Sequence, residues 1–518
     1  MIVLAAASFP TPSLDYGALA PMLVVFAAAL VAVLVEAFVP RTYRAMVQQA
    51  IAVAGLIAAF VAVVVNATSG TAAITAEGAV AVDGPTLFIQ GTVLLLSLGG
   101  VLLMSERSID PSGDAFAPTG SAVPGSDDER AAATAGWRQT EIYPLTLFSV
   151  GGMLLLPASN DLLTLFVAVE VLSLPLYILA GLARRRRLIS QEASLKYFVL
   201  GSFSSAFMLF GIAYLYGFSG SLELGAIASA LGSTIGRDPL LLIGISMLAV
   251  GLLFKVSAVP FHSWTPDVYQ GSPTPVTALM AAGTKVAAFG ALLRVFYVAL
   301  GGVRWDWRPM MWAIAILTML VGSVLAVTQT DVKRLLAYSS IAHAGFILVG
   351  LLAIDRAGVS STLFYLVAYG FTTIGAFAVV TLVRDSAGEA THLSQWAGLA
   401  RRSPVVASVF ALFLLALAGI PLTSGFTGKF AVFSAAIGGG AAPLAIVGVL
   451  ASAIAAFFYV RVIVLMFFSE PAPDGPTVAV PSMFTTAAVT LGVVVTIVLG
   501  VLPQPLLDLA DRAAVFVR

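Results

Sequence analysis

Four ionisable residues stand inside long apolar stretches of the sequence. Glu170, Lys255, Lys285 and Lys429 each lie within a mostly apolar run that is long enough to cross a membrane. A charge at the centre of a bilayer costs at least about 2.5–3.5 kcal/mol, so such a residue is a functional candidate by default. Burial makes a lysine release its proton more readily, and a nearby carboxylate opposes this effect. These residues could therefore hold and release protons in turn.

Three further residues could extend a proton route. Lys196 lies near the inner end of its apolar run, His262 follows Pro260, and His343 lies near the middle of a polar-lined run. Histidine titrates near neutral pH, which suits a relay if water reaches the ring. The alternative for the two histidines is a structural hydrogen bond. The alternative for the charges is a set of static ion pairs that lock helices together.

Composition places these residues in a membrane protein. Of the 518 residues, 59% are hydrophobic and 10% are charged, whereas soluble proteins have about 25% charged residues. The absence of cysteine excludes disulfides and cysteine-ligated iron–sulfur clusters. The net charge of zero gives no reason to expect a nucleic-acid partner. We find no nucleotide-binding or metal-ligand motif, so we expect no cofactor in this chain. No charged segment precedes the first apolar run, so we expect no cleavable signal peptide.

The apolar runs predict an all-α polytopic membrane protein of about 14 transmembrane helices. The runs cover residues 17–39, 47–65, 84–104, 142–158, 161–183, 191–217, 239–270, 274–300, 308–328, 332–353, 360–384, 405–437, 444–469 and 481–503. With the N-terminus outside, the inner segments hold 14 basic residues and the outer segments, including Arg518, hold 6. The positive-inside rule therefore predicts both termini on the outer face. The run Arg184–Arg187 is interpreted as a topology anchor. Arg294 and Arg461 lie toward span ends, where long side chains usually snorkel to the interface.

Two runs are too long for a simple span and contain a helix breaker. Pro260 interrupts the run 239–270, and Pro421 and Gly425 interrupt the run 405–437. We therefore expect broken helices 7 and 12, which mark ion or substrate sites in transporters. Asp161 and Asp331 open segments of similar texture, each followed by two spans and a break. Spans 4–8 and 9–13 are thus expected to be two five-helix repeats, inverted because five is odd.

The predicted organisation has five parts. Residues 1–104 form three N-terminal spans, 105–140 a cytoplasmic insertion, 141–300 the first repeat, 301–470 the second repeat, and 471–518 the last span and tail. The insertion is rich in Ser, Gly, Pro and acidic residues, so we expect it to be flexible. Hydroxyls near the buried charges could hold water or pack helices together; they are Ser257, Thr284, Ser340 and Thr427.

Several segments carry a family resemblance. Phe254–Val276 resembles the signature of the antiporter-like membrane subunits of respiratory complex I, and Glu170–Pro175, Lys333–His343 and Pro421–Phe430 agree with it. The resemblance is strong over about 140–470. Among the related subunit types the chain most resembles the N type. It ends after span 14 without a long lateral helix, and it keeps Lys429 where the M type carries glutamate.

The resemblance implies roles for the candidate residues. Glu170 and Lys255 are similar to the family's ion pair between spans 5 and 7, Lys285 to its connecting lysine, and Lys429 to its terminal lysine near the outer exit. Lys196 matches a family lysine in span 6. The remaining candidates, His262 and His343, are possible relays.

The expected function is a proton-translocating membrane subunit of NADH-quinone oxidoreductase in a bacterial plasma membrane. The resemblance implies that flavin and iron–sulfur clusters lie in partner subunits, and that the neighbours are membrane subunits of the M, K and J types. Electron transfer from NADH to quinone would thus occur outside this chain. One alternative is a subunit of a multisubunit cation/proton antiporter or of another related membrane complex, for which sodium could replace the proton. Another is a membrane scaffold with static charges.

Overall fold

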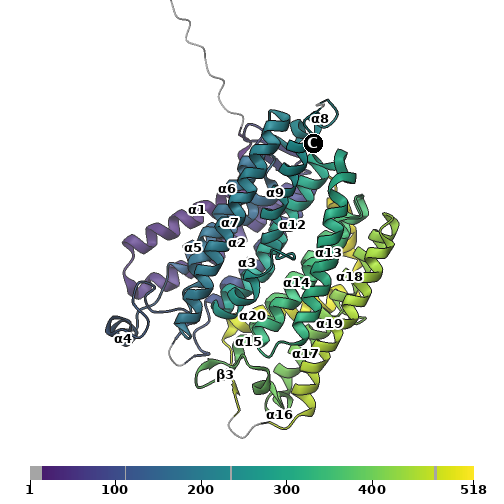
Figure 1. Ribbon diagram of the computed structural model, residues 1–518. Coiled ribbons are helices and arrows are strands. Elements are labelled where there is room, and N and C mark those ends of the chain that lie inside the picture. The colour runs from purple at the N-terminus through teal and green to yellow at the C-terminus, as the bar shows by residue number, and fades with distance from the viewer. Residues whose placement is uncertain (1–13, 111–112, 234–235, 472–474, 518) are drawn as a thin grey trace, which may run out of the picture.

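A computed structural model describes residues 14–110, 113–233, 236–471 and 475–517. Long helices run side by side in one elongated bundle (Figure 1). Among the described residues, 12 helices have the length and hydropathy of a membrane span, and two shorter apolar helices cover Ile142–Ala158 and Pro404–Ala418. The predicted polytopic helical membrane fold is confirmed. The count of about 14 spans stays a prediction. Residues 1–13 and Arg518, which was counted among the outer basic residues, lie outside the described residues.

The N-terminal helices begin where the sequence supplies an aspartate cap. Asp15 and Asp83 each accept a hydrogen bond from the first turn of the helix that follows, which satisfies backbone donors that lack a partner within the helix. The elements are α1 (Tyr16–Phe38), α2 (Arg41–Thr68), α3 (Gly84–Met104), α4 (Asp127–Thr134), α5 (Ile142–Leu155) and the short η1 (Leu156–Ala158).

The first predicted break is confirmed. The run 239–270 divides at residues 257–263, where Ser257 adopts a left-handed conformation with φ of 66° and Pro260 lacks a backbone donor. The elements of this region are α6 (Leu162–Ala180), α7 (Arg187–Ser219), α8 (Leu224–Ala230), α9 (Asp238–Val256), α10 (Trp264–Gly271), α11 (Thr274–Leu279), η2 (Met280–Thr284), α12 (Lys285–Arg294), η3 (Val295–Ala299), η4 (Gly301–Val303) and α13 (Arg304–Val327).

The second predicted break is also confirmed. The run 405–437 divides at residues 419–423, and Gly419 ends the first half with φ of 85°, a conformation that favours glycine. The elements are α14 (Val332–Leu351), α15 (Arg356–Leu382), η5 (Leu393–Trp396), α16 (Leu399–Arg402), α17 (Pro404–Ala418), α18 (Ser424–Gly438), α19 (Ala442–Phe468), α20 (Met483–Val501) and α21 (Gln504–Ala513).

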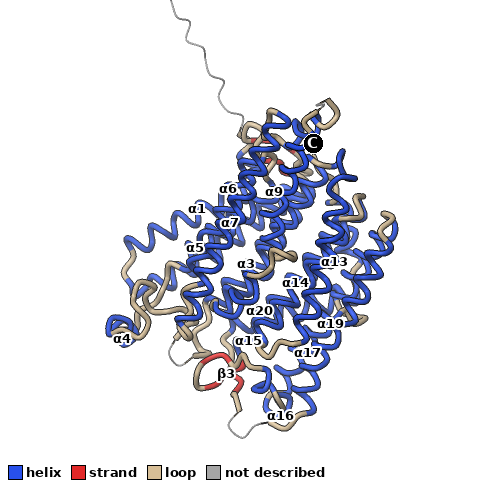
Figure 2. The backbone as a smooth tube through the Cα atoms, viewed as in Figure 1, coloured by secondary structure: helices blue, strands red, loops and turns tan. Residues whose placement is uncertain are grey.

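Short strands close the two ends of the bundle, and hydropathy did not predict them. The antiparallel pair is β1 (Ala73–Thr75) with β2 (Val80–Val82), in which Ala73 lies opposite Val82. A second sheet has the order β4-β3-β5 and consists of β3 (Val383–Asp385), β4 (Gly388–Glu389) and β5 (Thr477–Val478). Figure 2 marks β3 at the end of the bundle that also carries α16. Strands this short leave no periodic pattern in a sequence.

Burial shows which helices form the centre. The helix Arg356–Leu382 and the helical stretch Thr274–Ala299 are fully buried along their most apolar windows, whereas the corresponding windows of α2 and α20 are 28% buried. Buried lysines lie on α12, α14 and α18, namely Lys285, Lys333 and Lys429. The outer helices have apolar surfaces that suit lipid or neighbouring subunits.

The two aspartates that open the predicted repeats lie at opposite ends of the bundle. Asp161 caps α6 and forms a backbone β-bridge with Glu223 beside α8, whereas Asp331 caps α14 and forms a backbone β-bridge with His392 beyond β4. Figure 1 places α8 and β3 at opposite ends. An inverted repeat requires this placement, but the repeat itself stays a prediction.

The described part of the 105–140 insertion is not the free loop that the sequence suggested. Its acidic residues pair with the arginine run, as in the Arg184–Asp114 pair at 2.8 Å. The other pairs are Arg185–Asp110 at 3.2 Å and Arg187–Glu129 at 3.1 Å. The insertion also contains α4, whose first turn is acidic. The arginine run therefore fixes the insertion to the bundle as well as marking one face. Residues 111–112 lie outside the described residues.

The prediction that Arg294 snorkels to the interface was wrong. Its side chain is fully buried and pairs with Asp83 at 2.7 Å, with a further hydrogen bond to Thr86. The backbone N–H of Val517 donates to the same aspartate at 3.0 Å, so this pair also holds the C-terminal segment. Arg461 fits its prediction better, because it is exposed and donates to the carbonyl of Val327.

Candidate functional site

Lys255 occupies the end of α9, next to the first break. Its side chain is 3% exposed, and its ammonium donates to the Ser173 hydroxyl at 2.7 Å and to the Tyr177 hydroxyl at 3.4 Å. The Tyr197 ring lies 5.7 Å from the ammonium and stacks on Trp264 of α10. The break places the lysine in this aromatic cage because α9 stops one residue beyond it. Neutral acceptors and ring faces thus hold the cation.

Glu170 does not form the predicted ion pair with Lys255 in this structure. Both residues are described, and no ion pair joins them; Lys255 instead contacts Ser173 and Tyr177, which follow Glu170 on α6. The carboxylate still acts electrostatically on the lysine. One carboxylate oxygen of Glu170 is buried without a hydrogen-bond partner. The pair is therefore open, with the lysine displaced toward the hydroxyls.

Lys285 lies at a contact between the first and second predicted repeats. It follows the π-helical turn η2 and is fully buried, and its ammonium donates to both the carbonyl and the hydroxyl of Ser340 on α14. The Ser340 hydroxyl also lies 2.7 Å from the Tyr369 hydroxyl of α15. The π-turn changes the direction of the side chains that follow it, a common feature of functional sites. Ser340, predicted either to hold water or to pack helices together, is the direct partner of Lys285.

His343 lies one turn beyond Ser340 on the same helix. Its Nδ1 is 2.9 Å from the Tyr365 hydroxyl and its Nε2 is 3.4 Å from the Tyr459 hydroxyl. Tyr459 in turn forms a close hydrogen bond with Ser339. The ring is 2% exposed. A neutral imidazole can donate with one nitrogen and accept with the other, so this position links hydroxyls on two sides.

Lys429 occupies the second break. It lies on α18, and its ammonium donates to the carbonyls of Leu417 and Ala418 at 3.0 and 2.8 Å and to the Ser452 hydroxyl at 2.8 Å. The two carbonyls end α17, where the helix dipole is negative. The break therefore creates the acceptors that hold the charge. The Phe346 ring lies 4.8 Å from the ammonium.

His343 connects the two lysines electrostatically. Both Lys285 and Lys429 act on its ring, and the Tyr369 ring lies 5.2 Å from the His343 ring and 5.7 Å from the Lys285 ammonium. The Phe346 ring lies 5.6 Å from the His343 ring and 4.8 Å from the Lys429 ammonium. The structure thus brings Lys285, His343 and Lys429 together, whereas Lys255 lies near Glu170 at the first break.

Two predicted relay residues lie apart from these groups. Lys196 is 41% exposed and pairs with Glu192 and Asp267, each at 2.7 Å. Asp267 also pairs with Arg334 at 2.7 Å. His262 lies half-buried in the first break, and no hydrogen bond joins its ring to a lysine among the described residues. The geometry therefore favours the four central residues and His343 over these two.

Sequence reasoning missed the hydroxyls that connect the charges. They are Ser173 and Tyr177 on α6, Tyr365 and Tyr369 on α15, Ser452 and Tyr459 on α19. The sequence offered one signal, because polar aromatic residues are rare inside runs as apolar as these. Their partners are distant in sequence, however, so spacing could not pair them.

Residues 159–455 match the family described as NADH:quinone oxidoreductase/Mrp antiporter, TM. The chain is 66% identical to NADH-quinone oxidoreductase subunit N of Rhodococcus opacus, covering 99% of this chain and 98% of the relative. It is 62% identical to subunit N of Acidothermus cellulolyticus, with the same coverage.

Solved structures share the fold. A chain of respiratory complex I from Thermus thermophilus, with bound aureothin, is 33% identical, with a TM-score of 0.76 over 95% of this chain and 99% of the other. A chain of the Mrp complex from Dietzia sp. DQ12-45-1b has a TM-score of 0.79 over 97% of each chain, at 23% identity. The second likeness concerns the fold alone.

Proposed function

The chain belongs to the antiporter-like membrane subunits of NADH-quinone oxidoreductase, in the subunit N group, and we propose that its buried lysines carry the protons. Its activity is that of one subunit of a proton-translocating complex in a bacterial membrane. Within it, Lys255, Lys285 and Lys429 are the carriers, Glu170 controls Lys255, and His343 is the relay between Lys285 and Lys429. Lys196 and His262 are secondary candidates.

One observation supports this proposal most strongly, namely the series of protonatable groups and hydroxyls that lie between Lys285 and Lys429. Lys285 contacts Ser340, His343 lies one turn further along the same helix with Tyr365 and Tyr459 on its two nitrogens, and the Phe346 ring contacts both His343 and Lys429. Each of these groups except the Phe346 ring can give up one proton and take another. A static scaffold needs no such series, and buried charges without carboxylate partners would destabilise it.

The order of the proton transfers follows from which groups can lose their charge. Lys285, held by two neutral oxygens of Ser340, can release a proton toward the Ser340 and Tyr369 hydroxyls. His343 can accept it on one nitrogen and release another from the opposite nitrogen. Lys429 then receives the proton and holds it against the α17 carbonyls. Each transfer moves one proton and leaves the donor ready to take up the next one.

Glu170 provides the coupling to Lys255. When the carboxylate closes on the ammonium, the lysine keeps its proton; when the pair opens, as in this structure, desolvation favours release. The open geometry, with Lys255 on Ser173 and Tyr177, is one of the two states that such a switch needs. An electrostatic change at Glu170 would select between them.

The surface around Glu170 suits a neighbouring subunit. Glu170 is half-buried, and it shares one face of α6 with the exposed side chains of Leu163, Val167, Leu174 and Ile178. Lipid tails cannot solvate a carboxylate. We therefore place another membrane subunit of the complex against α6, so that the row of charges continues into it. Neighbours of the M, K and J types are those that the family resemblance implies.

The redox chemistry belongs to other subunits in this proposal. The chain has no cysteine, and we propose that it binds no flavin, iron–sulfur cluster or other cofactor. Both ends of the described chain lie beside the β1–β2 pair, since Asp15 bonds to Thr75 and Val517 to Asp83. By the charge bias of the loops we place this end on the outer face and the arginine-rich end inside.

The test uses Lys255→Ala and Glu170→Gln in the assembled complex. Co-purification with the redox subunits, together with NADH oxidation by a soluble artificial acceptor, reports assembly, and proton pumping with quinone as acceptor reports transport. We expect the first to stay normal and the second to fall, while Glu141→Gln, an exposed matched control, changes neither. Undiminished pumping in both site variants would refute the proposed roles. Loss of assembly in both would instead favour the scaffold interpretation.

A further inference from the structure

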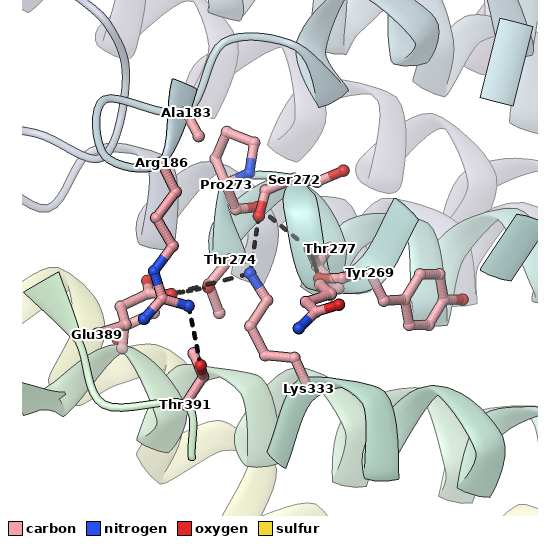
Figure 3. A network of polar contacts seen from close by, with 12 residues as sticks. Ala183, Arg186, Tyr269, Ser272, Pro273, Thr274, Thr277, Lys333, Glu389 and Thr391 are labelled. Carbon is pink, nitrogen blue, oxygen red and sulfur yellow. Dashed lines mark hydrogen bonds and ion pairs between the residues drawn. The ribbon is translucent and has the colours of Figure 1, made fainter. Parts of the chain in front are cut away.

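A polar cluster at the arginine-rich end has no role in the pathway described so far. Figure 3 shows Lys333 of α14 extending toward Ser272 and Glu389, next to Arg186. The Lys333 ammonium donates to the Ser272 carbonyl at 2.8 Å and lies 3.8 Å from a Glu389 oxygen. Thr274 donates to that same oxygen at 2.5 Å. The cluster thus joins α14, the start of α11 and strand β4.

Lys333 is poorly neutralised for a buried cation. Its side chain is 3% exposed, whereas that of Glu389 is 21% exposed. A structural ion pair at this depth usually has short contacts, because burial of a charge is costly without them. The 3.8 Å separation is loose, and the remaining hydrogen bond is to a neutral carbonyl. The cation is therefore held in a way that allows it to lose a proton.

Glu389 faces a cavity that can hold water. The cavity measures about 60 Å³, and a single water needs roughly 10–15 Å³ on this measure. The charged groups around it, besides Lys333 and Glu389, are Asp110, Asp114, Arg184, Arg185, Arg186 and Arg384; Asp331 also acts on Lys333. Gly388, with φ of 123°, follows the hairpin turn and begins the β4 strand that carries Glu389 to this place.

A second, smaller cavity lies beyond Lys333 along α14. Leu336 and Ser339, which lie three and six residues after Lys333, line this cavity of about 10 Å³ together with Tyr369, close to the minimum for one water. Ser340, the partner of Lys285, lies two helical turns from Lys333, a rise of roughly 10 Å. The route from Lys333 to Ser340 is thus short enough for one or two waters.

We propose that Glu389 and Lys333 form the proton-uptake site at the arginine-rich end and supply Lys285. Glu389 takes a proton from water in the larger cavity and passes it to Lys333, which has just released its own proton inward. One proton enters for each proton that leaves. This inference rests on the proposed function, since it needs Lys285 to be a proton carrier.

The decisive variant is Lys333→Arg. Arginine keeps the charge and can still donate to Ser272 and Glu389, but it does not release its proton in proteins. A structural role predicts normal pumping in this variant, whereas an uptake role predicts loss. We expect pumping to be largely lost while oxidation of NADH by an artificial acceptor stays normal. Normal pumping in the assembled variant would overturn the inference.

Glu389 is tested by Glu389→Gln with rescue by Glu389→Asp. The glutamine variant should lose pumping most strongly at high pH, where protons are scarce, and the aspartate variant should restore it. Glu470→Gln, whose carboxylate is 85% exposed in a surface pair with Arg401, should match the unmodified complex at every pH. Equal pH profiles for Glu389→Gln and Glu470→Gln would overturn the inference.

Lys285→Met in the same assay separates the two proposals. If it abolishes pumping while Lys333→Arg and Glu389→Gln pump normally, uptake occurs elsewhere and the proposed function stands. If Lys285→Met itself pumps normally, the proposed function fails and the uptake inference fails with it.

Discussion

Lys285 on α12 donates hydrogen bonds to both the carbonyl and the hydroxyl of Ser340 on α14. The carbonyl can hold the lysine, but only the hydroxyl can pass a proton on. One residue thus separates two roles that are usually difficult to separate, namely anchoring of a buried cation and transfer of its proton. The lysine lies on a helix of the first predicted repeat, and the serine lies on a helix of the second.

Ser340→Ala should reduce pumping without releasing Lys285. The carbonyl remains as an acceptor, but the hydroxyl bridge to Tyr369 is lost, at a cost to stability of about 1 kcal/mol. Proton pumping and thermal denaturation of the purified complex measure the two effects. Ser246→Ala is the matched control, because this exposed hydroxyl bonds only within its own helix. Equal pumping in both variants would exclude the hydroxyl from the route.

His343→Gln should abolish transfer between the lysines. Glutamine can donate and accept hydrogen bonds at this position but takes up no proton at neutral pH. A structural histidine would therefore be replaceable, and a relay would not. Pumping by the variant complex gives the answer, with the exposed His392→Gln as the control that should behave normally. If both variants pump alike, His343 is a structural hydrogen-bond partner.

Glu106 should make stability depend on pH. Burial raises the pKa of this carboxyl, but hydrogen bonds from Ser482 and Ser108 outweigh that effect and hold it at about 2, below the ordinary 4.5. A lowered pKa stabilises the folded state above the ordinary value, and this contribution disappears as pH falls toward 2. The denaturation temperature in detergent should thus fall more steeply below about pH 5 in the unmodified protein than in Glu106→Gln. Parallel curves for the two proteins would contradict the assigned hydrogen bonds.

The Asp83–Arg294 pair should be essential to stability. Both side chains are 1% exposed, so Asp83→Asn keeps the helix cap but leaves the arginine charge buried, at a cost of about 3–5 kcal/mol. Asp511→Asn breaks the Arg356 pair, which is 55% exposed on both sides, and should cost about 0–1 kcal/mol. Thermal denaturation compares them. Similar denaturation temperatures for the two variants would mean that the buried pair is not a major support.

The sequence predicted those features that depend on composition and on single residues. Apolar runs located the spans, Pro260 and Pro421 located the breaks, and rarity of charge identified Glu170, Lys255, Lys285 and Lys429. The membrane environment makes such residues conspicuous because every charge inside it is costly.

Features that depend on pairing at a distance were not predictable. Arg294 looked like a snorkelling residue because its partner Asp83 lies 211 positions away. The insertion looked flexible because its acidic residues find the arginine run only in the folded chain. The open arrangement of Glu170 and Lys255 depends on two hydroxyls of α6, and a sequence without an alignment cannot choose between open and closed pairs.

The most direct test of proton passage through this chain is the pumping of the assembled complex that carries Lys285→Met. Methionine fills a similar volume without a charge or a proton to transfer, so packing around Ser340 should survive. We predict that oxidation of NADH by an artificial acceptor is normal and that quinone-linked proton pumping is lost or strongly reduced. Undiminished pumping per NADH oxidised would contradict the account.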